Sequence, residues 1–212
     1  MNRNLNDKQL KKLADGREYR SMAVELRTLE DNDMTVEGYA TTFNKPYLLY
    51  EEPGFKVYEQ IDARAFDECD MRDVIMQYDH KDRVYARTRN NTLMLTVDER
   101  GLLIRAYLGG TDIGKQLYQE IKGGYTDKMS FGFIVAESKR ESVMNSETGE
   151  VVVTRTITKI KKLFDVSAVS IPANDMTSIS ARDYFNGVIE EIKAERLLRA
   201  NKIKKIKLLM EV

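Results

Sequence analysis

Apolar and polar residues alternate with a period of two along most of the chain from Tyr19 onwards. The runs "MAVELRTLE" and "MTVEGYATTF" flank the polar triplet at 31–33, a pattern that predicts a β-hairpin. Three further runs, "VYARTR", "TLMLTVDE" and "LLIRAYL", are separated by Asn90-Asn91 and Arg100-Gly101. Both dipeptides suit turn positions that require positive φ, so three consecutive strands are expected here.

The remaining β-like segments are two long runs and one short one. The runs "KMSFGFIVAES" and "VVVTRTITKIKKLFDVSAVSIPA" flank a polar turn around "NSETGE". The short run "RDVIMQYDH" has an apolar centre of the length of a buried strand, and it ends at His80. Residues 44–70, between the first hairpin and this short run, contain Pro46 and Pro53 and predict a loop that leads to "ARAFDE".

Two segments have helical patterns. In "TDIGKQLYQEIKGG", Thr111 or Asp112 can cap the N-terminus, apolar residues recur every four positions, and Gly123-Gly124 can end the helix. From Asp183 the chain is rich in helix formers, ending in "NKIKKIKLLMEV". That basic stretch is short, so a helix that packs on a surface or binds a partner is expected rather than one that binds a membrane.

The pattern as a whole predicts a mainly β protein with peripheral helices (α+β), arranged as an antiparallel barrel or sandwich, because parallel βαβ alternation is absent. We divide the chain into a polar N-terminal arm (1–16), a β domain (17–183) and a helical C-terminal tail (184–212).

Composition adds several exclusions. Thirty-four Lys+Arg balance 34 Asp+Glu, so net charge gives no reason to expect nucleic acid or an acidic membrane as a partner. A single cysteine, Cys69, excludes an internal disulfide and a cysteine-based zinc site and fits a reducing compartment. The first residues lack a signal-peptide apolar run, and no stretch approaches about 18 apolar residues. We therefore expect a soluble protein made in a cytoplasm.

The chain has one histidine, His80, at the junction of an apolar run and a charged loop. Histidine can act as base and acid near neutrality, but the residue taken alone favours an ordinary histidine at the surface or at a strand end. Its neighbours Asp79 and Asp82 do not have the spacing of a common metal site. A thiol dyad with Cys69 is disfavoured, because the acids of "DECDMRD" would raise the pKa of the thiol.

Two further residues are candidates for chemistry. Ser130 lies in the strand-like "KMSFGF" and is either a small filler or a nucleophile, with nearby glycines leaving room for a substrate or forming a bulge. Asp165 is an acid among apolar residues in "KKLFDVSAVSIPAN". It either orients a histidine or pairs with Lys161 or Lys162. For Ser167 and Ser170 the alternation favours packing or hydrogen bonding.

Four ordered motifs, "VEGYATTFN", "YDHKD" with "ARTRNNTLMLTVDERGLLIRAYL", "KMSFGF" and "FDVSAVSIPAN", resemble the prohead proteases of tailed bacteriophages. The resemblance extends from about Tyr19 to about Arg182. These enzymes look like relatives of the herpesvirus assembly proteases (assemblins), which implies a β-barrel of that type.

The resemblance implies a serine endopeptidase in which His80 is the base, Ser130 the nucleophile and Asp165 the third catalytic residue. The herpesvirus enzymes use a second histidine in that role, which this chain lacks. Their arginine-bearing oxyanion loop has no clear counterpart here. No cofactor or metal ion is implied.

The implied substrates are scaffold and major capsid proteins, cleaved inside the assembling prohead in the host cytoplasm, with self-cleavage near a terminus and possible homo-oligomers. The alternative is a non-enzymatic capsid-assembly or scaffold component with the same barrel. A nucleic-acid-binding barrel is disfavoured, because no strand interleaves aromatic and basic residues.

Overall fold

The computed structural model describes residues 16–22, 26–29, 33–145 and 147–170, together with Ala194, Leu198 and Lys202. The strands are β1 (Glu18–Met22), β2 (Arg27–Thr28), β3 (Thr35–Thr42), β4 (Tyr47–Glu52), β5 (Phe55–Ile61), β6 (Ile75–Tyr78), β7 (Lys81–Arg87), β8 (Leu93–Val97), β9 (Gly101–Tyr107), β10 (Lys128–Met144) and β11 (Val151–Val169). The helices are the 3₁₀ turn η1 (Thr88–Asn90) and α2 (Asp112–Lys122).

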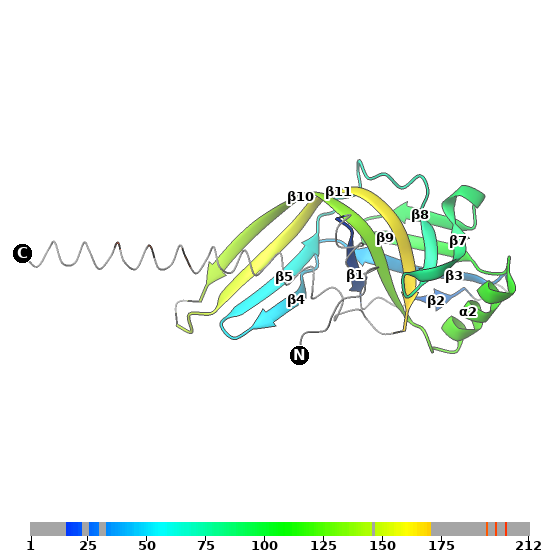
Figure 1. The fold of residues 1–212 in the computed structure, drawn as a ribbon, viewed down its shortest axis with the longest axis horizontal. Coiled ribbons are helices and arrows are strands. Elements are labelled where there is room, and N and C mark those ends of the chain that lie inside the picture. The colour runs from blue at the N-terminus through cyan, green and yellow to red at the C-terminus, as the bar shows by residue number, and fades with distance from the viewer. Residues whose placement is uncertain are drawn as a thin grey trace, which may run out of the picture.

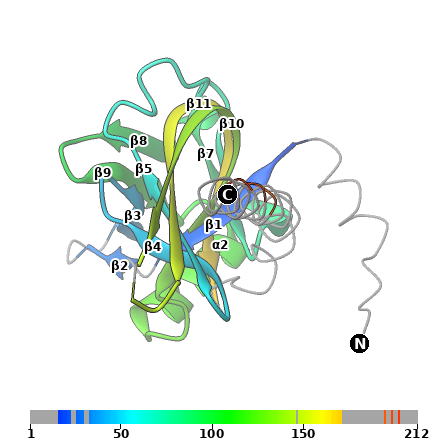
Figure 2. The same cartoon turned by 90° about the vertical axis from the view of Figure 1, so that its left-hand side faces the viewer.

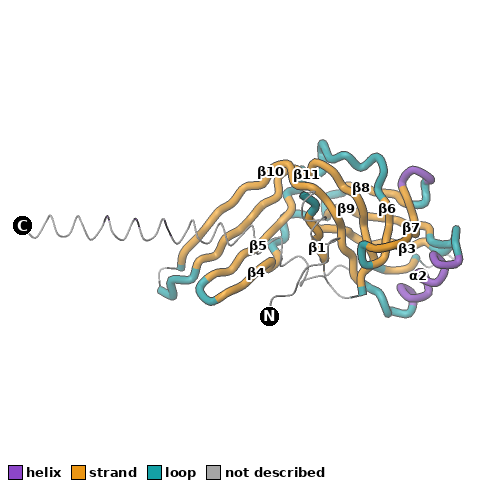
Figure 3. Tube along the Cα trace, in the orientation of Figure 1, coloured by secondary structure: helices purple, strands orange, loops and turns teal. Residues whose placement is uncertain are grey.

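The described strands form two sheets, as Figures 1 and 3 show. The seven-stranded sheet has the order β1-β10-β11-β5-β4, with β6 also paired to β11 and β7 to β6. The four-stranded sheet has the order β2-β3-β9-β8. The mainly β class expected from the alternating pattern is therefore confirmed.

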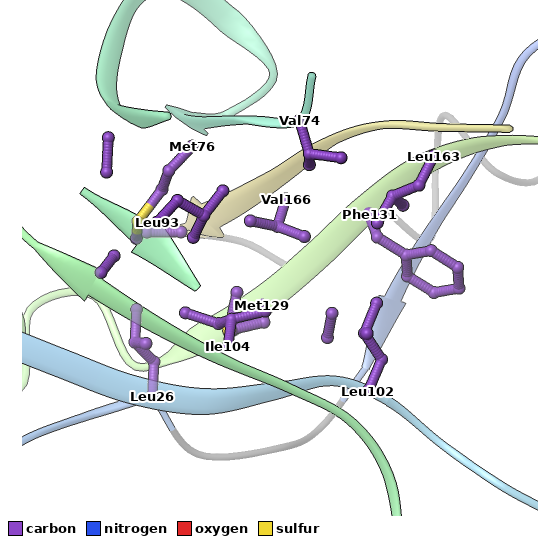
Figure 4. Packing of buried hydrophobic residues seen from close by; sticks show 14 of the residues in the cluster. Leu26, Val74, Met76, Leu93, Leu102, Ile104, Met129, Phe131, Leu163 and Val166 are labelled. Atoms are coloured by element: carbon purple, nitrogen blue, oxygen red, sulfur yellow. The ribbon is translucent and has the colours of Figure 1, made fainter. Parts of the chain in front are cut away.

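The hydrophobic core lies between the inner faces of the two sheets (Figure 4). The four-stranded sheet contributes Leu102 and Ile104, and the larger sheet contributes Met129, Phe131 and Val166, all without exposed surface. Burying each such side chain stabilises the fold by about 1.5–3 kcal/mol. Since β10 alternates, the residues between its core positions face away from this core.

The second half of β10 and the first half of β11 extend past the core and form, with β4 and β5, an arm that projects from the body (Figures 1 and 2). Phe55, Val57, Val151 and Val153 form a separate buried cluster within it. At the opposite end, α2 lies close to β2, as Figure 1 shows.

The local signals around the hairpins and the helix are confirmed. β2 and β3 pair antiparallel around the polar triplet, and Asn91 has φ 59° in the turn between β7 and β8. The Thr111 side chain caps α2 by accepting a hydrogen bond from the Gly114 N–H, and Gly124 follows the helix with φ 72°.

The expectation of a loop over residues 44–70 is wrong, because β4 and β5 form an antiparallel hairpin there. Its turn is Pro53-Gly54, with Gly54 at φ 82°, the conformation that a type II turn requires of its third residue. Pro46 precedes β4, which is an edge strand, so neither proline interrupts a central ladder.

The expected closed antiparallel barrel is not confirmed, since the pairing of the described strands gives two sheets without closure. Most ladders are antiparallel, but β11 pairs parallel with both β5 and β6. The N-terminal arm, except Gly16, and all but three positions of the C-terminal tail lie outside the described residues. Within the described part of the chain, no helix is long and apolar enough to cross a membrane.

A buried ionic cluster attaches β1 to the rest of the large sheet. It consists of Glu18 and Arg20 from β1, Tyr47 from β4, Glu59 from β5 and Arg155 from β11. Arg155 Nη1 donates to Glu18 Oε2 at 2.8 Å and to Glu59 Oε2 at 2.9 Å, and Arg20 pairs with both carboxylates. Two arginines balance two glutamates, so burial leaves no charge unpaired within the cluster.

The ionic cluster makes the stability of the protein dependent on pH. Burial alone would raise the pKa of the Glu18 carboxyl, but Arg20 and Arg155 outweigh it and lower that pKa from 4.5 to about 2. A carboxyl whose pKa is lower in the folded state stabilises the fold above its unfolded pKa, and this contribution disappears as pH falls.

We therefore expect Glu18→Gln to lower the free energy of unfolding at pH 7. The difference from the native protein should shrink as pH falls from about 4.5 to about 2. Urea unfolding at several pH values measures this, with Glu141→Gln on the exposed part of β10 as the control. A difference that stays constant over this range would contradict the assignment.

Candidate active site

His80 lies in the turn between β6 and β7. The sequence had suggested the end of a strand instead. Tyr78 pairs with Lys81, and the two residues between them, Asp79 and His80, have φ of 47° and 55°. Positive φ at both central positions defines a type I′ hairpin turn. Each non-glycine residue in this region costs about 1–2 kcal/mol.

The β11 strand holds this turn in place. The Asp79 N–H donates to the Ala168 carbonyl at 3.0 Å, and the Ser170 N–H donates to Asp79 Oδ1 at 3.3 Å. Since β6 also pairs with β11, the turn is fixed to the same strand that carries Asp165. The strained backbone thereby directs the imidazole towards one position on the sheet.

Ser130 and Asp165 lie on the same face of the large sheet, on adjacent strands. In the β10–β11 ladder Ser130 pairs with Ser167 and Gly132 with Asp165. Residues that are opposite or two apart on neighbouring strands share a face, so the serine, the glycine and the acid all lie opposite the core side. Ser130 has no exposed surface, and Asp165 is 3% exposed.

The structure brings His80, Ser130 and Asp165 into contact, although His80 and Asp165 are 85 residues apart in the sequence. His80 Nε2 lies 2.5 Å from Ser130 Oγ, and His80 Nδ1 contacts Asp165 Oδ1. An ionised carboxylate can only accept, so the proton belongs on Nδ1, and Nε2 is then the acceptor for the serine hydroxyl.

Gly132 is required by its neighbours. A Cβ atom built at this position would lie 2.4 Å from Asp165 Oδ2 and 2.7 Å from a ring carbon of Tyr19. The sequence had suggested that glycine leaves room for a substrate or forms a bulge. In the structure the space is filled by the carboxylate and the tyrosine ring.

β1 contributes contacts that sequence reasoning missed. The Tyr19 ring meets the His80 ring edge-on with centroids 4.5 Å apart, and the Arg20 carbonyl oxygen lies 3.0 Å from Ser130 Oγ, as a second possible acceptor of its proton. Both follow from the pairing of β1 with β10, where Ser21 is opposite Ser130. No local signal in the sequence reveals that pairing, because its register is set by a partner more than 100 residues away.

The other candidate residues have different environments. Burial, with a smaller contribution from Asp70, raises the pKa of the Cys69 thiol to about 11, so it is not a ready thiolate. Lys162 was considered as a partner of Asp165, but its Nζ lies 3.7 Å from Oδ2 of Asp70 instead. In the part of the chain that the structure describes, no group of three or more His, Cys, Asp and Glu side chains could hold a metal ion.

A serine hydrogen-bonded to an imidazole, which is itself hydrogen-bonded to a buried carboxylate, is the arrangement found in serine hydrolases on several unrelated folds. The chain belongs to the caudovirus prohead serine protease family, whose model matches residues 22–193. It is therefore a member of a family of serine peptidases of bacteriophage capsid maturation. Neither the curated proteins nor the solved structures gave a match.

The tight contact at Gly132 leads to a prediction. Gly132→Ala should displace the Asp165 carboxylate, and a shift of about 1 Å in such a group costs about 10²-fold in rate. The measurement is the rate at which a co-expressed capsid protein is cut, with thermal unfolding of the variant alongside it.

Gly110→Ala provides a matched control, since its Cβ would meet only a Tyr107 ring carbon at 3.9 Å. It should leave the rate unchanged. If both alanine variants were equally active, the packing at Gly132 would have no part in the reaction.

Proposed function

We propose that this protein is an endopeptidase that cleaves scaffold and major capsid proteins inside the assembling prohead, with Ser130 as nucleophile, His80 as base and Asp165 as the orienting acid. The observation that carries the proposal is the pair of contacts made by one imidazole, Nε2 with Ser130 and Nδ1 with Asp165. Family membership independently supports serine peptidase chemistry.

In the proposed mechanism His80 Nε2 accepts the Ser130 proton while Oγ attacks the scissile carbonyl carbon. The imidazolium then donates that proton to the leaving amine, and a water molecule repeats the sequence to release the acyl group. Asp165 keeps the neutral ring protonated at Nδ1 and stabilises the imidazolium that forms. It accepts hydrogen bonds throughout and takes up no proton.

The Arg20 carbonyl gives the serine hydroxyl a second acceptor. A hydroxyl has one proton, so it can donate either to His80 Nε2 or to the Arg20 carbonyl. When the imidazole is protonated at both nitrogens, Nε2 can only donate, and the hydroxyl is left with the carbonyl as its acceptor. The active arrangement therefore requires the neutral imidazole.

The burial of Ser130 supports restraint of the enzyme before assembly. With no exposed surface, its Oγ reaches a substrate carbonyl only after the elements over this face of the sheet move. We propose that the described state is closed, that incorporation into the prohead opens it, and that self-cleavage near a terminus accompanies activation. In this scheme the protease domain is residues 17–183, the N-terminal arm is residues 1–16 and the C-terminal tail is residues 184–212.

We further propose descent from the same ancestor as the herpesvirus assembly proteases, with Asp165 in the place of their second histidine. The two packed sheets and a nucleophile near the start of a strand are compatible with this relation. Pairing of subunits, as in those enzymes, is part of the same proposal.

A non-enzymatic capsid component is the competing function, and one experiment separates the two. The protein is co-expressed with its coat and scaffold proteins as wild type, as Ser130→Ala and as Ser142→Ala, an exposed serine further along β10. Fragment masses are read by mass spectrometry, including those of the protein itself.

We expect Ser130→Ala to lower cleavage by a factor on the order of 10⁴ to 10⁶. Ser142→Ala should behave as the wild type. Identical fragments from wild type and Ser130→Ala would exclude Ser130 as the nucleophile, and a complete absence of fragments from assembled wild-type particles would favour the structural component.

A further inference from the structure

Ser167, for which the alternation in the sequence favoured packing or hydrogen bonding, belongs to the same cluster of side chains. It lies on β11 directly opposite Ser130 and two residues after Asp165, and it has no exposed surface. Its Oγ lies 3.1 Å from Asp165 Oδ1 and 3.1 Å from His80 Nδ1. Ser167 thus touches both groups that support the Ser130 hydroxyl.

The direction of these hydrogen bonds follows from which groups can donate. Asp165 Oδ1 accepts from His80 Nδ1, so Nδ1 carries a proton and cannot accept one from Ser167. The single proton of the Ser167 hydroxyl must therefore point to Asp165 Oδ1, and an oxygen lone pair faces the Nδ1–H. The buried carboxylate receives two donors on one oxygen.

The same reasoning separates Ser167 from the nucleophile opposite it. Ser130 faces Nε2, the nitrogen that is free to accept a proton, whereas Ser167 faces the protonated Nδ1. A hydroxyl in that position is not activated by the imidazole. Two serines from adjacent strands thus contact opposite nitrogens of one ring, with different consequences.

We propose that Ser167 is a positioning residue, whose hydroxyl fixes the Asp165 carboxylate and, through it, the orientation of the His80 ring. The inference rests on the proposed function of Ser130, His80 and Asp165. A carboxylate that is 3% exposed needs hydrogen-bond donors to remain in place, and Ser167 supplies one in addition to the imidazole.

The sole histidine makes a direct spectroscopic test possible. In a Ser130→Ala background, which prevents self-cleavage, the proton on His80 Nδ1 gives one ring N–H signal in ¹H NMR with no competing histidine. Adding Ser167→Ala removes the second donor from Asp165 Oδ1, which leaves this oxygen a stronger acceptor for Nδ1–H.

We expect the Nδ1–H signal to move to lower field with Ser167→Ala and to stay near its original position with Ser167→Thr, which keeps a hydroxyl. Ser142→Ala serves as the matched serine control and should not move it. A signal that stays in place or moves to higher field in Ser167→Ala would overturn the assignment.

Kinetics with Ser130 intact provide the second readout, measured on enzyme taken from assembled particles with a peptide that contains a cleavage site found there. Ser167→Ala should lower kcat by between about tenfold and about 100-fold with KM unchanged, and Ser167→Thr should recover most of it. Equal losses in both variants would mean that Ser167 only fills space. Since the NMR test needs no catalysis, the inference about Ser167 can fail while the proposed function stands. Equally, the proposed function can fail while the hydrogen bonds of Ser167 are confirmed.

Discussion

The antiparallel ladder between β10 and β11 is the interaction on which the rest of the structure depends. It joins the two longest strands, and every other strand of the large sheet pairs with one of them or with a strand that does. Its register places Ser130 opposite Ser167 and Gly132 opposite Asp165. A slip of β10 by one residue would turn Ser130 and Gly132 towards the core and take Phe131 out of it.

The ladder also explains why the site is assembled from such distant segments. β11 holds the β6–β7 turn by parallel pairing and by the backbone bond from Asp79 to Ala168, which sets the imidazole above the sheet. β10 pairs on its other edge with β1, which the ionic cluster anchors to β5 and β11. Three features therefore support the group formed by His80, Ser130 and Asp165. They are the positive φ at His80, the lack of a side chain at Gly132 and the buried ion pairs of Arg20.

Sequence reasoning succeeded where the information is local. Strand periodicity, the caps of α2 and the turn at Asn91 are properties of a few neighbouring residues, and the structure agrees with them. The order of the motifs was enough to select His80, Ser130 and Asp165, which the fold brings into contact. It failed at residues 44–70, where two prolines suggested a loop although Pro53-Gly54 forms the turn of a hairpin.

What could not be predicted depends on pairing between distant strands. The contacts of Tyr19 and Arg20 with the site, the parallel pairings of β11 and the bonds of Ser167 follow from registers that no short segment encodes. The role of Gly132 is of the same kind. Its sequence context permitted a bulge or an open approach, and only the position of Asp165 shows which atoms occupy the space.

Activation of Ser130 by His80 can be tested by covalent labelling of the serine. Native protein and His80→Ala are each assembled into particles with the coat and scaffold proteins and treated with an organophosphorus fluoride. The adduct is located by mass spectrometry of the tryptic peptide Met129–Lys139, in which fragmentation separates Ser130 from Ser138. Activation of Ser130 by His80 predicts one adduct per chain, on Ser130, forming at least about 100-fold more slowly in His80→Ala. Labelling of another serine, or labelling of Ser130 at the same rate without the imidazole, would contradict it.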